Sequence, residues 1–282
     1  MIQATLLALA ALAPSDWPQL FGPDRTGVVA ERGWSAEGAD EPLWERNVGR
    51  GYSCPSIVGG RLVTMGFDAE AELDLVLCLD AATGEELWVH TYAATDAPRY
   101  HGGGTLTTPA IADGVVYTVN RHGRAFALDL ESGEPLWERD YQAELELPAT
   151  FHGYCASPIV VGERLVLDLG GTAAAVERDG GALVWRTEDR GDGAYSNATV
   201  FALRGRTLVA AMLGQTLHVL DVDDGAPVYE LAWPLQGNAV HCAQPLVIGD
   251  RMLLSTAYGK GSAMLRLGEE TEPEVLWTSR RL

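Results

Sequence analysis

The chain has 282 residues, of which 47% are hydrophobic and 21% charged, and its mean hydropathy is 0.00. This balance is typical of a globular protein with a sizeable core and argues against a disordered chain. The formal net charge of −19 argues against nucleic acid and anionic membranes as partners, because phosphate groups would be repelled. The chain has no apolar run of the roughly 18 residues that a transmembrane helix needs, so no such helix is predicted.

The N-terminus resembles a secretory signal peptide. Residues 2–13 are apolar and rich in Ala and Leu, although no Lys or Arg precedes them. Small side chains at Ala13 and Ser15 permit cleavage before Asp16. We therefore expect a signal peptide over residues 1–15 and an exported protein, periplasmic or otherwise associated with the cell envelope. A misassigned start codon or a short buried segment is the alternative interpretation of these residues.

The cysteines predict neither a disulfide framework nor a zinc ribbon. They are scattered, and no C-x-x-C spacing occurs among Cys54, Cys78, Cys155 and Cys242.

Aromatic residues recur along the chain with a spacing of 44 to 49 residues. The series is Trp44, Trp88, Trp137, Trp185, Tyr229 and Trp277, although the neighbouring Trp233 leaves the register of the fifth member open. A bulky aromatic side chain repeated in this way indicates packing between successive copies of one structural unit. We favour this packing role over the stacking of a cofactor.

Each unit also carries the same turn and the same opening. An Asp-x-x-x-Gly turn precedes the aromatic residue at 80–84, 129–133 and 221–225, with a weaker copy at 177–181. The Asp side chain can accept hydrogen bonds from turn amides, and Gly supplies a positive φ. The openings, at 54–63, 108–117, 157–166 and 244–254, read as strand, Gly-containing turn and strand. Four short strands in about 45 residues predict one blade of a β-propeller.

The turn Asp-x-x-Thr/Ser-Gly-x-x-Leu-Trp resembles the repeat of PQQ-like, or quinoprotein-like, β-propellers. The segment from Asp16 to Gly27 is similar to the opening of exported bacterial members of this family. The resemblance covers residues 16–282 and implies an all-β propeller domain over that range. It leaves function open, because the superfamily includes PQQ-dependent alcohol dehydrogenases, a non-enzymatic lipoprotein of outer-membrane protein assembly and many proteins of unknown role.

The strand count predicts five blades and an open ring. Residues 41–45 read as an outermost strand with no blade of its own before it, and residues 275–277 already complete the fifth blade. Because family propellers carry seven or eight blades, we expect two or three further blades beyond Leu282. A closed ring of five blades is the alternative.

Polar and aromatic residues come just before the strands that line the channel in this family. They form a candidate ligand-binding rim at the channel mouth, made of Tyr52, Tyr100, His101, His152, Tyr154, Tyr195, Asn197 and His241. Such side chains can also merely satisfy strand ends and hold water. A third alternative is a metal site using His101, His152, His241 or the thiols, but the spacing matches no known ligand motif.

The sequence favours a non-catalytic exported propeller that binds or scaffolds in the cell envelope, with a protein or a small molecule at the channel mouth. The alternative is a PQQ-dependent quinoprotein oxidoreductase, for which PQQ and calcium would be the cofactors. Quinoprotein alcohol dehydrogenases carry adjacent cysteines near the cofactor, and no Cys-Cys pair occurs in this sequence. A module of a larger exported protein is a further possibility.

Overall fold

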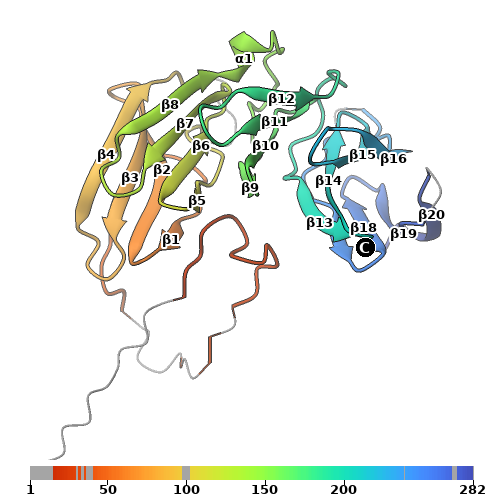
Figure 1. The fold of residues 1–282 in the computed structure, drawn as a ribbon, viewed down its shortest axis with the longest axis horizontal. Coiled ribbons are helices and arrows are strands. Elements are labelled where there is room, and N and C mark those ends of the chain that lie inside the picture. Colours follow the sequence, from red (N-terminus) through yellow and green to blue (C-terminus); the bar gives the residue numbers. More distant parts are fainter. Residues whose placement is uncertain are drawn as a thin grey trace, which may run out of the picture.

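The chain forms five antiparallel sheets of four strands each, which stand side by side around an arc (Figure 1). The computed structural model describes residues 15–29, 31–32, 35, 41–96, 102–237, 239–268 and 272–281. The expected signal peptide over residues 1–15 lies outside these residues except for Ser15. In every sheet the strand order follows the chain order, as expected for propeller blades. The predicted all-β fold with five four-stranded blades is confirmed.

The first two blades hold the first eight strands. Blade one comprises β1 (Ser56–Val58), β2 (Arg61–Asp68), β3 (Leu73–Asp80) and β4 (Glu86–Ala93). Blade two comprises β5 (Ala110–Ala112), β6 (Val115–Val119), β7 (Arg124–Asp129) and β8 (Pro135–Asp140). One helical turn, α1 (Tyr141–Glu144), follows β8.

Blades three to five repeat this plan. Blade three comprises β9 (Ile159–Val161), β10 (Arg164–Asp168), β11 (Ala173–Glu177) and β12 (Leu183–Arg186). Blade four comprises β13 (Thr199–Leu203), β14 (Arg206–Leu213), β15 (Thr216–Asp221) and β16 (Pro227–Ala232). Blade five comprises β17 (Leu246–Ile248), β18 (Arg251–Thr256), β19 (Gly261–Arg266) and β20 (Glu274–Ser279). The first strands β1, β5, β9 and β13 face the concave side of the arc, and β4, β8 and β20 lie on its convex side (Figure 1).

The burial pattern explains why the middle strands have nearly continuous apolar sequences. β2 and β3 are buried over most of their length, whereas the outer strand β4 is buried only at intervals. A sheet covered on both faces by neighbouring blades needs apolar side chains on both faces of its central strands. Four hydrophobic clusters fill the four spaces between successive blades, so the core is divided along the arc.

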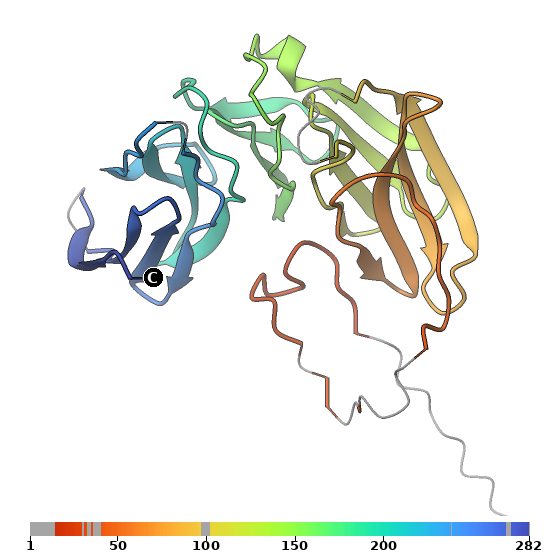
Figure 2. The same cartoon turned by 180° about the vertical axis from the view of Figure 1, so that it is seen from behind.

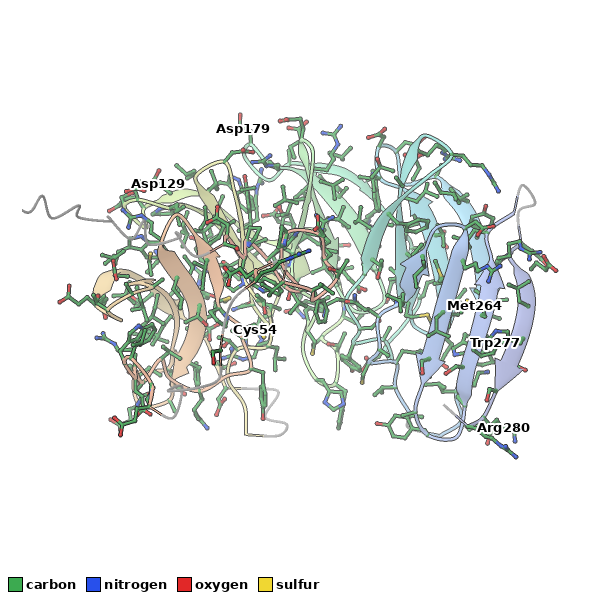
Figure 3. The ribbon with its side chains drawn as sticks, turned by 90° about the horizontal axis from the view of Figure 1, so that it is seen from below. Cys54, Asp129, Asp179, Met264, Trp277 and Arg280 are labelled. Atoms are coloured by element: carbon green, nitrogen blue, oxygen red, sulfur yellow. The ribbon has the colours of Figure 1, made fainter. Side chains whose placement is uncertain are left out.

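The Asp-x-x-x-Gly turns join the third and fourth strands. The carboxylate of Asp80 accepts hydrogen bonds from the backbone N–H groups of Ala82 and Thr83, at 3.0 and 2.9 Å, and Gly84 has a φ of +73°. In all five blades the register between the third and fourth strands shifts near the connection that joins them, which marks a repeated β-bulge. Figure 3, seen across the arc, shows the turn residues Asp129 and Asp179 at one face and Arg280 at the opposite face.

Each repeated tryptophan packs on the turn of the following blade. The Trp88 indole N–H donates to the Leu130 carbonyl at 2.9 Å, and a Cβ added to Gly133 would lie only 2.6 Å from the indole ring. Equivalent hydrogen bonds join Trp44, Trp137 and Trp185 to Ala81, Arg178 and Val222. The packing role predicted for the tryptophans is thereby confirmed.

The two ends of the series differ from this pattern. Residues 41–49 contain no strand, yet Trp44 still packs on the turn of blade one at Gly84. Among the described residues no strand forms at 41–45, and its pairing with a blade beyond Leu282 stays a prediction. In blade four the fifth aromatic position is Tyr229, whose hydroxyl donates to the Gly268 carbonyl at 2.5 Å. Trp277 in β20 is 40% exposed.

Candidate functional site

The N-terminal segment, residues 15–29, runs along the concave side of the arc (Figures 1 and 2). Trp17 exchanges two backbone hydrogen bonds with Ile57 of β1, at 2.7 and 2.8 Å. The next carbonyl, of Pro18, accepts from the Ile111 N–H of β5 at 2.7 Å. Arg25 then donates to the Val160 carbonyl of β9 at 2.6 Å. The segment thus contacts the innermost strands of three successive blades.

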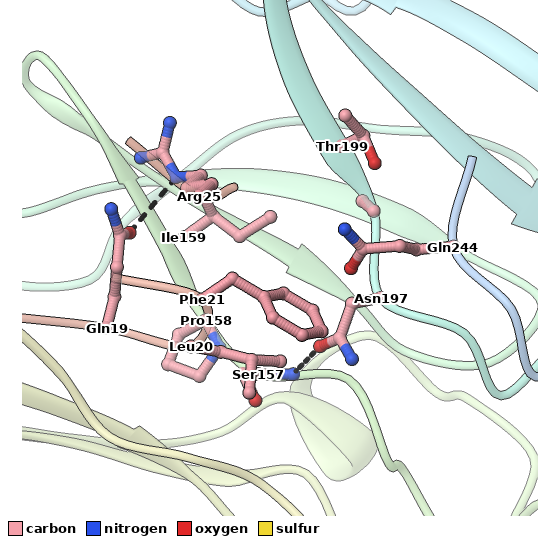
Figure 4. A pocket seen from close by; sticks show the side chains of 11 residues that line it. Gln19, Leu20, Phe21, Arg25, Ser157, Pro158, Ile159, Asn197, Thr199 and Gln244 are labelled. Carbon is pink, nitrogen blue, oxygen red and sulfur yellow. Dashed lines mark hydrogen bonds between the residues drawn. The ribbon is translucent and has the colours of Figure 1, made fainter. Parts of the chain in front are cut away.

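Close packing fixes the shape of this segment (Figure 4). The Arg25 guanidinium donates to the Gln19 side chain at 3.0 Å, and burial lowers the pKa of Arg25. Phe21 lies near Ser157 and Asn197, and the residual cavity there is only about 30 Å³, which is the scale of one water molecule. Gly22 has a φ of +79°, and a Cβ there would meet the Trp17 ring at 2.7 Å. These contacts hold the segment against the blades, and the pocket beside it has room for no ligand larger than about one water molecule.

A much larger hollow, of about 1130 Å³, lies among the connections between the blades. We call it the rim cavity. Its walls come from residues before the first strands and from hairpin loops between the second and third strands. They are Tyr52, Gly103, Gly104, Leu106, Phe151, His152, Cys155, Asp192, Gly193, Tyr195, Gln215, Gly237, Ala239, Val240, Cys242 and Tyr258. The lining is therefore mainly aromatic, small and uncharged.

Three rings on one wall of the rim cavity are held edge to face. The centroids of Phe151 and His152 are 5.0 Å apart, and those of His152 and Tyr195 are 4.7 Å apart, with interplanar angles of 87° and 79°. The Tyr195 hydroxyl donates to the Asp192 carboxylate, which also accepts from the Phe151 N–H at 2.9 Å. Burial, followed by the hydrogen bond to Asp192, raises the pKa of Tyr195. Asp192 thereby ties the wall of blade three to that of blade four.

The family model described as outer membrane protein assembly factor BamB matches residues 34–195 and 72–281. The chain belongs to this family. The BamB of Yersinia pestis is 26% identical over 222 residues, which cover 77% of this chain and 50% of that protein. The BamB of Salmonella typhimurium is 26% identical over 220 residues, with the same coverage. The chain spans about half the length of the curated BamB relatives it matches.

Solved structures support the same fold. The BamB of Moraxella catarrhalis superimposes with a TM-score of 0.57 at 18% identity, covering 79% of this chain and 62% of that one. A europium-containing methanol dehydrogenase superimposes with a TM-score of 0.64 at 12% identity, covering 84% of this chain and 52% of that one. At these identities the likeness shows the β-propeller fold alone. The resemblance to PQQ-like propellers found in the sequence is confirmed.

The structure brings three of the predicted rim residues of this BamB-family chain to the rim cavity, namely Tyr52, His152 and Tyr195. Asn197 lies at the small pocket beside the N-terminal segment, and its side-chain oxygen accepts from the Ser157 N–H at 2.7 Å. Tyr100 and His101 lie outside the described residues.

The other two predicted residues face the core of the BamB-family fold. Tyr154 is buried between blades two and three and donates its hydroxyl hydrogen to the Pro148 carbonyl at 2.9 Å. His241 is buried with its Nδ1 3.2 Å from the Thr256 hydroxyl, and burial lowers the pKa of its imidazole to about 4. Neither residue lines the rim cavity.

Two thiols also line the rim cavity of this BamB-family protein. Burial raises the pKa of Cys155 to about 12, and burial also raises the pKa of Cys242. Both thiols therefore stay protonated at neutral pH, and a protonated thiol is a weak nucleophile and a weak metal ligand. In the described ranges no group of three His, Cys, Asp or Glu side chains is placed to hold a metal ion.

Sequence reasoning missed the contribution of the hairpin loops. Gln215 and Tyr258 lie between the second and third strands of blades four and five, and both line the rim cavity. These loops lie at the same face as the connections between blades, because antiparallel strands alternate in direction. That alternation was the available signal. No helix among the described residues is long and apolar enough to cross a membrane.

Proposed function

We propose that this chain is a non-catalytic binding module of the cell envelope that acts as a scaffold in protein assembly. The observation that carries the proposal is membership of the BamB family together with a rim cavity built from several blades. The relatives are named outer membrane protein assembly factors, and the chain spans half of their length. The apolar N-terminal residues 2–13 support export into the envelope.

The chemistry of the rim cavity supports binding over catalysis. Its two thiols have raised pKa values, the Tyr195 hydroxyl already donates to Asp192, and the His152 ring is packed edge to face between Phe151 and Tyr195. A general acid or base needs a pKa near the working pH and a proton to exchange with substrate. What the lining offers instead is aromatic surface, backbone groups at glycines and a few hydrogen-bonding side chains. These are the parts of a recognition surface.

The quinoprotein alternative fits the described lining poorly. PQQ is a planar quinone that carries three carboxylates, and such an anion calls for cationic side chains around it. The described lining residues include the carboxylate of Asp192 and no Lys or Arg. The adjacent cysteine pair of the quinoprotein alcohol dehydrogenases is also missing from the sequence. We therefore derive no reaction through PQQ for this chain.

Two measurements test the proposal. The first is to delete the gene in the source organism, fractionate the cells, and quantify folded β-barrel proteins of the outer membrane. In the parent strain we expect the protein in the envelope fraction. In the deletion strain we expect a smaller amount of folded outer-membrane β-barrel proteins. The second is a thermal-shift titration of the protein with PQQ, with and without calcium. A ligand that binds only the native state must raise the melting temperature, so a saturable, calcium-dependent rise would revive the oxidoreductase alternative.

A further inference from the structure

We infer that the rim cavity binds an extended polypeptide segment with a cationic side chain, Arg or Lys, placed against the aromatic wall. The inference deepens the proposed function and rests on it. Three features of the cavity carry it: its size, its exposed rings and its charge.

The size of the rim cavity favours a chain segment over a metabolite. Pockets for small molecules have volumes of roughly 300–1000 Å³. The rim cavity, at about 1130 Å³, exceeds that range, and glycines at positions 103, 104, 193 and 237 bring bare backbone to its wall. The concave side already accepts polypeptide, because the N-terminal segment pairs through its backbone with Ile57 and Ile111. An extended segment could use the same kind of contact in the cavity.

Exposed aromatic rings surround the rim cavity. Tyr52 is 54% exposed, Phe151 62% and Tyr258 67%, and these residues come from blades one, three and five. Large aromatic side chains exposed around one hollow mark a recognition site, since aromatic anchors dominate protein interfaces. The ring faces carry negative potential and attract ammonium and guanidinium groups. The same protein uses this contact elsewhere, because the Lys260 ammonium lies 4.3 Å from the Trp233 ring centroid.

The charge of the rim cavity selects for a cation. Of its described lining residues, Asp192 carries a carboxylate and none is Lys or Arg. The chain as a whole has a net charge of −19, so the field also favours a basic ligand. Asp192 is held by the Gly193 N–H at 2.7 Å, the Phe151 N–H at 2.9 Å and the Tyr195 hydroxyl. A carboxylate has about four acceptor sites, so one site of Asp192 remains for an incoming donor. Because the three hydrogen bonds already hold the carboxylate in place, binding need not order it further.

The test is calorimetric titration of the whole protein at about 0.15 M salt, where long-range attraction is screened. The probe is an acetylated and amidated octapeptide of alternating valine and arginine, compared with the same peptide carrying glutamine or glutamate in place of arginine. We expect one site for the arginine peptide, binding about tenfold weaker for the glutamine peptide, and none for the glutamate peptide. Equal binding of the arginine and glutamine peptides would overturn the inference.

Variants of unchanged net charge separate the rim cavity from general attraction to an acidic protein. The double variant Phe151→Ala/Tyr258→Ala removes two exposed rings, and we expect about tenfold weaker binding of the arginine peptide. Leu43→Ala, an exposed position away from the cavity, is the matched control and should bind as the parent does. Wild-type affinity in the double variant would overturn the inference. Competition between maltohexaose and the peptide for the site would also overturn the inference, because it would indicate a saccharide ligand.

Asp192→Asn tests the charge separately from the rings. We expect it to reduce the preference for arginine over glutamine, with its melting temperature checked because Asp192 also holds Phe151 and Tyr195. An unchanged preference in a folded variant would contradict the role of the carboxylate. If the gene deletion lowers outer-membrane barrels while no probe peptide binds, this inference fails and the proposed function stands. If the deletion has no such effect, the proposed function itself fails.

Discussion

Because each tryptophan packs on the next turn, substitution of the glycine in that turn should destabilise the protein far more than the glycine's backbone conformation alone would require. Gly133 has a φ of +74°, and an added Cβ would lie 2.6 Å from the Trp88 ring. Gly114, in the β5–β6 turn, has a φ of +78°, and an added Cβ there would meet nothing within 4 Å. Gly133→Ala and Gly114→Ala therefore impose the same backbone strain and differ in one packing contact.

The magnitudes follow from these two environments. An alanine with left-handed φ costs about 1–2 kcal/mol, and the stiffer unfolded chain returns about 0.4–1 kcal/mol of that. We expect Gly114→Ala to lower the free energy of unfolding by about 1 kcal/mol. Forcing a methyl group into the Trp88 ring adds the cost of overpacking, about 1–3 kcal/mol. We therefore expect Gly133→Ala to lower the free energy of unfolding by about 2–4 kcal/mol.

Urea unfolding followed by tryptophan fluorescence measures both changes, with equal slopes against urea as the check that only stability has changed. The same pair is then measured in a Trp88→Leu background, where the smaller side chain leaves room for the added methyl group. There the excess cost of Gly133→Ala should disappear, which a double-mutant cycle reports as a coupling free energy. Equal costs for the two alanine variants in the parent protein would refute the reasoning, as would an excess that survives in Trp88→Leu.

Three further predictions concern buried side chains. Because the pKa of His241 is lowered to about 4, the unfolded chain binds a proton that the folded protein does not between pH 6.5 and 4. The free energy of unfolding should therefore decrease as the pH is lowered from 6.5 to 4, and it should decrease less in His241→Gln. The same dependence of the urea midpoint on pH in both proteins would contradict this. Arg121→Met strands the buried Asp74 carboxylate, 2.8 Å from Arg121, and should cost about 3–5 kcal/mol, largely recovered by adding Asp74→Leu. Trp88→Ala, at a position 9% exposed, should cost about 3–5 kcal/mol, and Trp277→Ala, at 40% exposure, should cost less, about 1–3 kcal/mol; similar melting temperatures would count against this.

The fold was predictable because its signals are local and repeated. The turn at 80–84 shows the Asp acceptor, the positive φ at Gly84 and the following tryptophan that the sequence pattern predicts. Because this turn occurs three times, with a weaker fourth copy, the blade repeat could be predicted even where a single strand could not. The expectation of further blades beyond Leu282 stays a prediction.

The candidate site was predictable as a region and less so residue by residue. Val240 and Cys242 line the rim cavity while His241 between them is buried, which is the alternation expected of an extended chain. The predicted rim combined neighbouring residues regardless of this alternation, and so included a histidine that faces the core. Tyr154 is different, because it follows Gly153, whose φ of +80° breaks any simple alternation. The inward orientation of Tyr154 therefore depends on a backbone conformation at Gly153 that could not be predicted from the sequence.

The contacts of the N-terminal segment could not be predicted, because they join residues far apart in the chain. In blade three, Cys155 lines the rim cavity, whereas Ile159 and Val160 in the following strand lie against the N-terminal segment. The same order holds in blade one, where Tyr52 lines the cavity and Ile57 pairs with Trp17. The segment therefore lies against the first strands, whereas in these two blades the rim cavity is lined by residues that precede them. The rim cavity lies among the interblade connections, on a different part of the blades from the N-terminal segment.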